Sequence, residues 1–437
     1  MIARREEQGS VLILVLVLLV ALVSLALSLG LRTRVELGAT QARLDDLRLR
    51  AMIDSAIELA LAEVRQDQLP GDTLGDAWRD DQARFAGYAF DEGRVWLLLT
   101  EPDPGDGREL RYGLRDENGK LNVNVATQEQ LELLPGMTTD AAAAIVDWRD
   151  EDDDPLDGGA ESDYYLSLDP PYQAKNSSIE SLEELLRVRW IDPAVLYGED
   201  RNRNGLLDPC EDDGDRSFPP DDADGVLDRG LIDYLTVFSR ELNRTVDERT
   251  RLVWEQASAE DVRDRLSEAS QATREGLASR AGRPLQSLGQ LLFEGMTPED
   301  AILVLDEFTL TDTEILVGRV NVNTAPREVL LGLPGLEEDD VEAILTARLD
   351  VSQDLSSPGW LLRALPLQKV QIIADIVTTR SEQFTVNALA QLDDRPQRFR
   401  RVEALIDRSF GPARILLWHD LTPLGFPLPG ERGEELP

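Results

Sequence analysis

The sequence predicts an α+β protein with a long N-terminal helix, short antiparallel strands in two separated segments, and a helical region between those segments. Three observations predict this class. Residues 8–31 carry no charged side chain, and a helically spaced apolar stripe continues beyond them. Segments of alternating polarity occur near residues 85–115 and again near 384–421. The composition between them is different, which indicates a domain inserted between two halves of a sheet.

The net charge disfavours one class of partner and favours another. The 437 residues contain 45 Lys and Arg against 84 Asp and Glu, a formal charge of −39. Such a chain repels a phosphate backbone, so we expect no nucleic acid among its partners and divalent cations as ligands instead. One cysteine and one histidine, Cys210 and His419, leave no material for a Cys/His zinc site, a Cys-His catalytic pair or an internal disulfide. Most enzyme classes that need an imidazole are therefore disfavoured.

The uncharged run at residues 8–31 is long enough to cross a membrane. At about 1.5 Å per residue, a helix over this run is about 36 Å long, against a hydrocarbon core of about 30 Å. A cleaved secretory signal has a shorter apolar region of about 7–15 residues, so a membrane-spanning helix is the better interpretation. Arginines flank the run on both sides, and charge alone leaves its orientation open.

Beyond this run, the spacing predicts that the helix continues to Asp67. Its apolar stripe, at steps of three and four, consists of Leu49, Ile53, Ala56, Ala60 and Val64. The sequence QLPGD at residues 68–72 ends the helix, because proline and glycine disrupt a helical turn. Residues 10–67 are therefore expected to form one helix with a membrane half and an amphipathic half.

Alternating segments predict a small antiparallel sheet from two parts of the chain. The first part covers residues 68–116, with strands near Phe85–Phe90, Arg94–Thr100 and Arg108–Arg115. The second part covers residues 381–422, with strands near Phe384–Leu392, Phe399–Ile406 and Ile415–Leu421. Residues 423–437 are rich in proline and glycine and are expected to form a loose tail.

Residues 117–380, between these parts, contain an internal repeat. Residues 122–149 align without a gap onto residues 321–348, and each copy predicts a helix, a tight Pro-Gly turn and a second helix. A DNA-binding helix-hairpin-helix has this form and offers backbone N–H groups to a phosphate. The acidic residues 337–340 follow the second turn and would repel a phosphate, so the repeat favours a packing module.

Two acidic loops in this region, residues 147–163 and 199–233, are candidate calcium sites. Crowded carboxylates repel unless they are solvated or bridged by a hard cation such as Ca²⁺. The second loop contains DRNRNGLLDPCE, which has the spacing of a calcium-binding loop. Its expected ligands are Asp200, Asn202, Asn204, the carbonyl of Leu206, Asp208 and Glu211. A weaker downstream pattern offers Asp222, Asp224 and Asp228. A solvated acidic surface is the alternative for both patterns.

The segment RREEQGSVLILVLVLLVALVSL resembles the leader of type IV pilins and type II secretion pseudopilins. The resemblance implies a leader at residues 1–9, cleavage after Gly9 by a membrane prepilin peptidase, and a mature, methylated N-terminus at Ser10. Most members have Phe and Glu at mature positions one and five, where this chain has Ser10 and Leu14. The missing glutamate resembles the K-type minor pseudopilins, which lie at the filament tip and need no subunit above them.

Further motifs carry the same resemblance, among them GKLNVN, DWRDEDDDP, GGAESDYY, SLEELLRVR, GRVNVNTAP and ARILLWHDL. The family implies that the long helix packs on a small antiparallel pilin-type sheet, with a large inserted all-α domain of helix-hairpin-helix and SAM-like modules. Family members bind calcium in this domain. The ligand candidates in the first acidic loop are therefore Asp150, Asp152, Asp154, Glu161 and Asp163.

The resemblance implies a non-enzymatic minor pseudopilin of the general secretion pathway protein K family, which caps the pseudopilus tip and supports export of folded periplasmic proteins across the outer membrane. It implies a single-pass protein of the bacterial inner membrane, with most of the chain in the periplasm. The implied partners are I-, J- and H-type minor pseudopilins, the major pseudopilin, the inner-membrane secretion platform and the prepilin peptidase. Alternatives are a minor pilin of a type IV pilus, a signal-anchored calcium-binding periplasmic protein, a membrane-anchored DNA receptor and a signal-anchored hydrolase.

Overall fold

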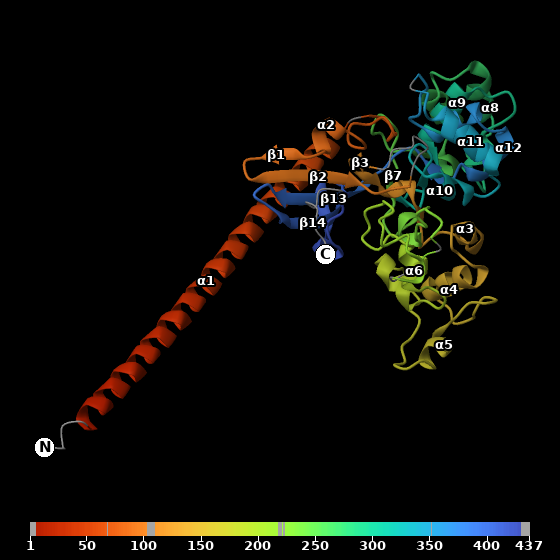
Figure 1. The fold of residues 1–437 in the computed structure, drawn as a ribbon. Helices are drawn as coiled ribbons and strands as arrows, with labels where there is room; N and C mark the ends of the chain where they lie inside the picture. The colour runs from red at the N-terminus through yellow and green to blue at the C-terminus, as the bar shows by residue number, and fades with distance from the viewer. Residues whose placement is uncertain are drawn as a thin grey trace.

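The structure, a computed structural model, describes residues 6–67, 69–102, 110–216, 221, 223–350 and 352–429, with side chains from Val11 onward except at position 215. A long helix projects from a small antiparallel sheet, and the helices from the middle of the chain lie beyond that sheet (Figure 1). The α+β class is confirmed at this level.

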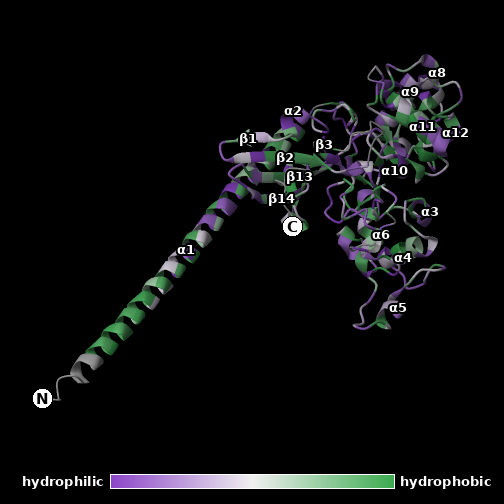
Figure 2. Ribbon diagram, in the orientation of Figure 1, coloured by the Kyte–Doolittle hydropathy of each residue, from purple (hydrophilic) through white to green (hydrophobic). Residues whose placement is uncertain are grey.

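The projecting helix, α1 (Glu6–Gln66), is 61 residues long. Its side chains from Val11 to Leu31 are all exposed, and Figure 2 shows this part of the helix as a hydrophobic segment. A helix that is apolar on every side needs lipid or protein around it. With a mean hydropathy of 3.2 in its most apolar window, α1 is long and apolar enough to cross a membrane once.

The second half of α1 packs on the sheet. All five residues of the predicted stripe are buried: Leu49, Ile53, Ala56, Ala60 and Val64. Met52, Ile57 and Leu61 extend the same face. The helix ends one residue earlier than predicted, shortly before Pro70.

The sheet has seven strands from two separated parts of the chain. The first part gives β1 (Tyr88–Phe90), β2 (Gly93–Leu99), β3 (Arg111–Tyr112) and β4 (Arg115–Asp116); the second gives β13 (Gln383–Leu392), β14 (Arg395–Asp407) and β15 (Arg414–Asp420). The order is β1-β2-β13-β14-β15, with β3 beside β2 and β4 beside β13, and all pairs are antiparallel. The described residues between Asp116 and Gln383 add no strand to this sheet.

Alternation along the strands gives the sheet two different faces. The face toward α1 forms a core with side chains that include Val95, Leu97, Val386, Ala388, Val402 and Ala404. The opposite face has a smaller core of Trp96, Leu98 and Leu389, covered by Phe426 and Leu428. The prediction of a loose tail is therefore wrong for residues 423–429, because these two apolar side chains are buried on the sheet. Residues 430–437 lie outside the described residues.

Two predicted strands differ from the structure in the first part of the sheet. Phe85 lies in a short helix, α2 (Gln82–Phe85), whose N-cap Asp81 accepts the backbone N–H of Arg84 at 3.1 Å. The strand predicted at Arg108–Arg115 begins outside the described residues and is divided into β3 and β4 at Gly113. A Cβ atom at Gly113 would lie 1.8 Å from the carbonyl oxygen of Arg79, so only glycine permits this close approach.

The middle of the chain consists of three successive modules, each opened and closed by a two-residue strand. These strands pair in parallel: β5 (Leu121–Asn122) with β6 (Leu235–Thr236), β8 (Leu252–Val253) with β9 (Phe308–Thr309), and β11 (Val320–Asn321) with β12 (Val377–Thr378). One further pair is antiparallel, β7 (Arg240–Leu242) with β10 (Ile315–Val317). A single hydrophobic core connects the three modules.

Short helices fill each module. The first module contains α3 (Gln128–Glu132), α4 (Thr139–Arg149), α5 (Ser162–Leu166) and α6 (Pro193–Tyr197). The second contains α7 (Ala259–Arg265), α8 (Gln271–Ala278) and α9 (Pro298–Glu307). The third contains α10 (Arg327–Leu331), α11 (Glu338–Ala347) and α12 (Leu367–Ile373). The sequence repeat at 122–149 and 321–348 forms the beginning of the first and third modules.

The expectation of an all-α domain needs correction at the short strands. In the repeated Asn-Val-Asn sequence, the side-chain oxygen of Asn122 accepts the N–H of Asn124 at 2.9 Å, and Asn321 accepts that of Asn323 at 3.0 Å. Such a local turn ends an extended segment after a few residues. The backbone before the turn pairs with the closing strand of the same module, as when Leu121 donates its N–H to the carbonyl of Tyr234 at 2.9 Å.

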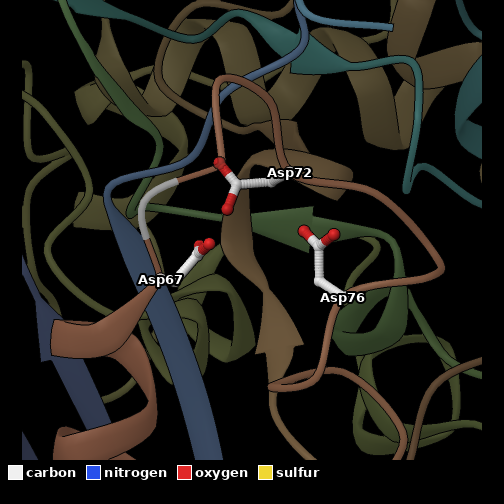
Figure 3. Close-up of side chains that lie close together, drawn as sticks. All are labelled: Asp67, Asp72 and Asp76. Atoms are coloured by element: carbon white, nitrogen blue, oxygen red, sulfur yellow. The ribbon is translucent and has the colours of Figure 1, made fainter.

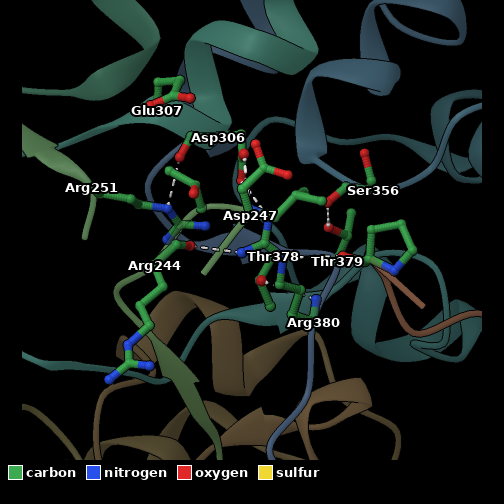
Figure 4. A network of polar contacts seen from close by, with 12 residues as sticks. Arg244, Asp247, Arg251, Asp306, Glu307, Ser356, Thr378, Thr379 and Arg380 are labelled. Carbon is green, nitrogen blue, oxygen red and sulfur yellow. Dashed lines mark hydrogen bonds and ion pairs between the residues drawn. The ribbon is translucent and has the colours of Figure 1, made fainter. Parts of the chain in front are cut away.

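Arg380 joins the second and third modules to the end of α1. Figure 4 shows its side chain in a polar network with Arg244, Arg251 and Asp306. The Arg380 guanidinium donates to the carbonyl oxygen of Arg244 at 2.6 Å and to that of Pro70 at 3.2 Å, and it pairs with the Asp306 carboxylate. Arg251 donates to the carbonyl oxygen of Asp306 at 3.0 Å. This network fixes the modules relative to the connection that follows α1.

Candidate metal centres

The carboxylates of Asp147, Asp150 and Glu161 converge in the first acidic loop. Asp147 lies in the last turn of α4, Asp150 is the C-cap of α4, and Glu161 is the N-cap of α5. One oxygen from each carboxylate lies within 4.8 Å of the other two. The end of one helix and the start of the next therefore bring three acids to one point.

Glu161 lacks the partner that a buried acid needs. Its side chain is 4% exposed, and neither carboxylate oxygen has a hydrogen-bond partner among the described residues. Burial, and then the charges of Asp147 and Asp150, raise the pKa of Glu161 to about 7. The pKa values of Asp147 and Asp150 are also raised, mainly by burial. Three carboxylates that lie this close together, one of them without a hydrogen-bond partner, can supply oxygen ligands to Ca²⁺.

Glycine and aromatic contacts shape this site. A Cβ atom at Gly159 would lie 2.0 Å from Oδ2 of Asp147, so any larger residue there would displace this carboxylate. Leu156 donates its N–H to Oδ1 of Asp147 at 3.2 Å. Next to Asp147, Trp148 packs edge-to-face on Tyr165 of α5, with ring centroids 5.1 Å apart. These contacts hold the ends of α4 and α5 close together.

The structure brings together two of the five predicted residues of this loop, Asp150 and Glu161. It adds Asp147, which the sequence analysis did not select. The other candidates lie outside the group, since Asp152 accepts the N–H of Asp154 at 2.9 Å and both Asp154 and Asp163 are exposed. The signal that could have identified Asp147 is its spacing of three residues from Asp150, which places both on one side of a helix end.

The predicted calcium loop after α6 is folded around its own carboxylates. Oδ1 and Oδ2 of Asp200 accept the N–H groups of Asn204 and Gly205 at 3.0 and 2.8 Å. The oxygens of Glu211 also accept backbone N–H groups, among them that of Asp208 at 3.1 Å. Gly205 has φ +75°, which supplies the turn expected of glycine at this position.

Asparagine amides fill the centre of this loop. The Nδ2 atoms of Asn202 and Asn204 donate to the same oxygen of Asp208, at 2.6 and 3.1 Å. Leu206 donates its N–H to Oδ1 of Asn204 at 2.8 Å. A cation that took ligands from these side chains would have to replace these hydrogen bonds. The predicted ligands are therefore near one another, but they are joined to each other.

The carboxyl groups of Asp200 and Glu211 are nevertheless buried, and burial disfavours their charged form. Burial raises the pKa of Asp200 to about 6 and that of Glu211 to about 7. The flanking elements are the five-residue helix α6 and a 3-10 turn at Gly214–Arg216, so the described residues do not form the helix pair of an EF-hand. Arg401 of β14 donates to the carbonyl oxygen of Asn202 at 2.5 Å, which ties the loop to the sheet.

The weaker downstream pattern does not form a carboxylate group in the described residues. Asp222 lies outside them. Asp224 accepts the N–H of Val226 at 2.7 Å, and Asp228 is exposed. Asp221, which was not predicted, instead accepts the N–H groups of Asp213 and Gly214 at 3.0 and 2.7 Å.

Comparison with known proteins identifies a family that part of this region resembles. A family model described as "Type II secretion system (T2SS), protein K" matches residues 117–197. Residues 117–197 are therefore similar to the domain of type II secretion system protein K that this model describes, and they are called the protein K domain below. This match confirms the resemblance to the protein K family that the motifs indicated. The protein K domain holds α3 to α6 and the group of Asp147, Asp150 and Glu161, and it ends before the Asp200 loop.

Two curated relatives are similar over 166 residues. The type II secretion system protein K of Pectobacterium carotovorum subsp. carotovorum is 28% identical, and that of Klebsiella pneumoniae is 26% identical. The aligned segments cover 33% and 36% of this chain. They cover 50% of each relative, so the chain spans about half the length of the curated relatives it matches.

A solved structure of the GspK-GspI-GspJ complex from the type 2 secretion system of enterotoxigenic Escherichia coli is also similar. The sequence identity is 14% and the TM-score is 0.43, over 87% of this chain and 98% of that chain. A likeness of this size does not determine function or partners.

A second acidic group, Asp67, Asp72 and Asp76, lies outside the protein K domain where α1 ends, and sequence analysis missed it (Figure 3). Arg408 supplies a positive charge here: its guanidinium lies 2.8 Å from Asp67 and 2.9 Å from Asp72. Burial raises the pKa of Asp72 well above its usual range. Asp76 accepts the N–H and hydroxyl of Thr73, both at 2.8 Å. The chain thus fills this site with its own cation.

Arginines at equivalent positions of the two sequence repeats, Arg149 and Arg348, bond to backbone carbonyl groups of their own modules. Arg149 donates to the carbonyl oxygens of Val123 and Ala126, and Arg348 makes the equivalent bonds to Val322 and Ala325, the latter at 2.6 Å. Burial lowers the pKa of Arg149 to about 10 and that of Arg348 to about 9. Each arginine therefore fastens the turn that follows the opening strand of its own module, which is a packing role.

The predicted processing residues lie at the start of α1. Gly9 and Ser10 are in the helix, but their side chains lie outside the described residues. Leu14 is exposed, as are its neighbours in the apolar half of α1. Their processing and tip roles stay predictions.

Proposed function

We propose that this chain is a non-enzymatic minor pseudopilin that caps the tip of a type II secretion pseudopilus. In this proposal α1 anchors the chain in the inner membrane, and residues 117–380 form a periplasmic domain inserted into a pilin-type sheet. The bulk of this domain blocks addition of another subunit, so the tip supports export of folded proteins across the outer membrane. The proposed partners are the I-, J- and H-type minor pseudopilins, the major pseudopilin, the secretion platform and the prepilin peptidase.

One observation carries this proposal. The protein K domain at residues 117–197 occurs in a chain whose helix α1 is packed on a sheet along its second half and fully exposed along its apolar first half. An exposed apolar helix of this length can span a membrane, and it can also pack side by side with the helices of other subunits. A domain beyond the sheet, at the opposite end from that helix, suits a terminal position in a filament.

The mature N-terminus tests the proposal directly. Protein is isolated from membranes of cells with and without an active prepilin peptidase, and its N-terminal sequence is read. A start at Ser10 that depends on the peptidase is expected. An intact leader in both strains would refute the pseudopilin proposal and leave a signal-anchored protein.

Leu14→Glu tests the tip position. A glutamate at this position is expected to disturb the place of the chain in a complex with I- and J-type partners, measured by co-purification from membranes. Leu18→Glu, in the same apolar segment, is the matched control for the cost of a charge in a membrane helix. Equal assembly of the Leu14→Glu variant and the unchanged chain would count against the tip-cap argument.

We further propose that Asp147, Asp150 and Glu161 hold a calcium ion, with the Asp200 loop as a second, weaker site. The unpartnered oxygens of Glu161 support the first site, and the raised pKa values of Asp200 and Glu211 support the second. Calorimetric titration of EDTA-treated full-length protein with Ca²⁺ is expected to show a tight site that Glu161→Gln removes and a weaker site that Asp200→Asn removes. Loss of no site in either variant would refute these assignments.

A further inference from the structure

A cavity of about 290 Å³ lies between the sheet and the first module. Its floor includes Thr385, Leu405 and Leu417, which are neighbours in one row across β13, β14 and β15. Glu403 and His419 are paired in the next row and also line the cavity. Residues of the first module, such as Leu182, Tyr197 and Ile232, form the opposite wall. The cavity therefore reaches the edge of the sheet at β15.

Strand β15 is an exposed edge. It ends the strand order, and no described strand pairs with its outer side. All seven of its residues are exposed, and its four central apolar side chains, Ile415 to Trp418, are 39 to 43% exposed. Edge strands usually avoid such exposure through charged residues, proline or coverage. Here the charged residues, Arg414 and Asp420, stand only at the ends of the strand, so the centre offers unpaired backbone groups beside apolar side chains.

The cavity has more negative than positive groups. Six acidic residues line it: Glu117, Glu180, Glu183, Asp200, Asp233 and Glu403. Three basic residues line it, and each already lies within 4 Å of an acid: Arg115 of Glu117 and Asp233, Lys120 of Glu117, and Arg203 of Glu183. Glu403 is half-buried and makes no ion pair within 4 Å among the described residues, although Arg115 and Lys120 attract it from beyond that distance. The wall nearest β15 thus holds a carboxylate that a cation would complement.

We infer that β15 and this cavity form a docking surface for an extended segment of a partner subunit, which pairs with β15 as an added strand and places a long basic side chain beside Glu403. Strand addition uses backbone hydrogen bonds for affinity and pockets for alternate side chains. Residues of the added strand that pair with Leu417 and His419 would lie next to these two residues, at the edge of the cavity. The stem of an arginine or lysine can cover Leu417 while its charged end reaches the carboxylate. This inference rests on the proposed function, since the partner is another minor pseudopilin.

Two substitutions in the full-length chain test the surface. Glu403→Lys reverses the charge at the cavity, and Leu417→Lys places a charge in the apolar row. Each is expected to lower co-purification of the I- and J-type minor pseudopilins from detergent-solubilised membranes by about tenfold or more. Asp394→Lys and Leu349→Lys are matched controls at exposed positions elsewhere and are expected to leave co-purification unchanged. Thermal unfolding of all four variants identifies any that fail to fold.

A photocrosslinking amino acid at position 419 identifies the occupant. A crosslink to a co-purified minor pseudopilin is expected, and a crosslinked homodimer would overturn the inference in favour of a second copy of this chain. A variant that ends at Pro429 is expected to bind partners equally well; increased binding would assign the surface to the chain's own tail and overturn the inference.

Co-purification distinguishes an error in the docking surface from an error in the proposed function. If the unchanged chain co-purifies with partners and both lysine variants do so equally well, the docking surface is wrong and the pseudopilin proposal stands. If the unchanged chain co-purifies with no minor pseudopilin, both are wrong. A His419 crosslink to a partner combined with unchanged binding of Glu403→Lys would refute the basic side chain specifically.

Discussion

Glu161→Gln keeps the size of a buried side chain and removes its charge. In the metal-free protein, burial and the nearby acids raise the pKa of Glu161 from its usual 4.5 to about 7. A shift of that size corresponds to about 3.4 kcal/mol at most, and we take about 2 kcal/mol because the neighbouring acids titrate together. At a pH between 4.5 and about 7, Glu161 binds a proton in the folded state and has lost it in the unfolded state. The metal-free protein therefore loses stability as the pH rises through this range, and glutamine avoids that loss.

The expected result is a reversal with calcium. At pH 8 in EDTA, Glu161→Gln should be more stable than the unchanged chain by about 2 kcal/mol, and near pH 4.5 the two should coincide. With Ca²⁺ at a hundred times its Kd, the unchanged chain should gain about 2.7 kcal/mol and the variant should gain little. Thermal unfolding of the full-length chain in detergent, followed by circular dichroism at both pH values, measures these differences.

Asp163→Asn is the matched control for this experiment. Asp163 is an exposed acid in the first turn of α5, outside the group of three. Its variant should retain the full calcium effect and change stability by no more than about 1 kcal/mol. Equal stabilisation of Glu161→Gln and the unchanged chain by Ca²⁺, or a loss of stability for Glu161→Gln at pH 8 in EDTA, would refute the reasoning.

Two further predictions concern the sheet and the modules. Arg408→Met leaves Asp67 and Asp72 without their counter-charge and should lower the free energy of unfolding by about 3–5 kcal/mol in denaturant titrations, whereas Arg398→Met, at an exposed position, should have little effect. Gly113→Ala should destabilise the protein strongly, because its Cβ would lie 1.8 Å from the carbonyl oxygen of Arg79. Gly276→Ala in α8 has open space around it and should instead stabilise by about 1 kcal/mol; the opposite order of the two glycine variants would contradict the packing described here.

Periodicity predicted the parts of the fold that depend on one buried face. The stripe from Leu49 to Val64 and the strands around Leu97, Ala388 and Ala404 read clearly because burial on one side imposes a period on the sequence. The two-residue strands were missed because two residues are too short to show alternation. The second module was missed as a module for a related reason: Trp254 and its neighbours share its architecture, but they do not share the Asn-Val-Asn and Pro-Gly sequences of the other two.

The candidate metal sites could be predicted from the sequence only where their ligands lie close together along the chain. A fixed spacing identified the Asp200 loop and its turn at Gly205, because those ligands are close in sequence. The group at Glu161 combines a helix end with a residue eleven positions beyond Asp150, and only the path of the loop brings them together. The number of acidic residues in a segment also does not show whether a basic side chain from elsewhere in the chain pairs with them. Asp67 and Asp72 are neutralised by Arg408, which is far away in the sequence.

The path of the chain at β4 and β13 has a mechanical consequence. The chain leaves the sheet after Asp116 and returns at Gln383, and Asp116 pairs directly with Phe384. A force on the modules would pull these two adjacent strand ends apart, so their hydrogen bonds would open one after another, like a zipper, instead of sharing the load. The bonds from Thr385 to Glu117, at 2.5 Å, and from Arg408 to Asp72 lie next to this opening point. They would carry the load first, and the strength of the joint would depend on a few partly buried polar contacts more than on the area of the sheet.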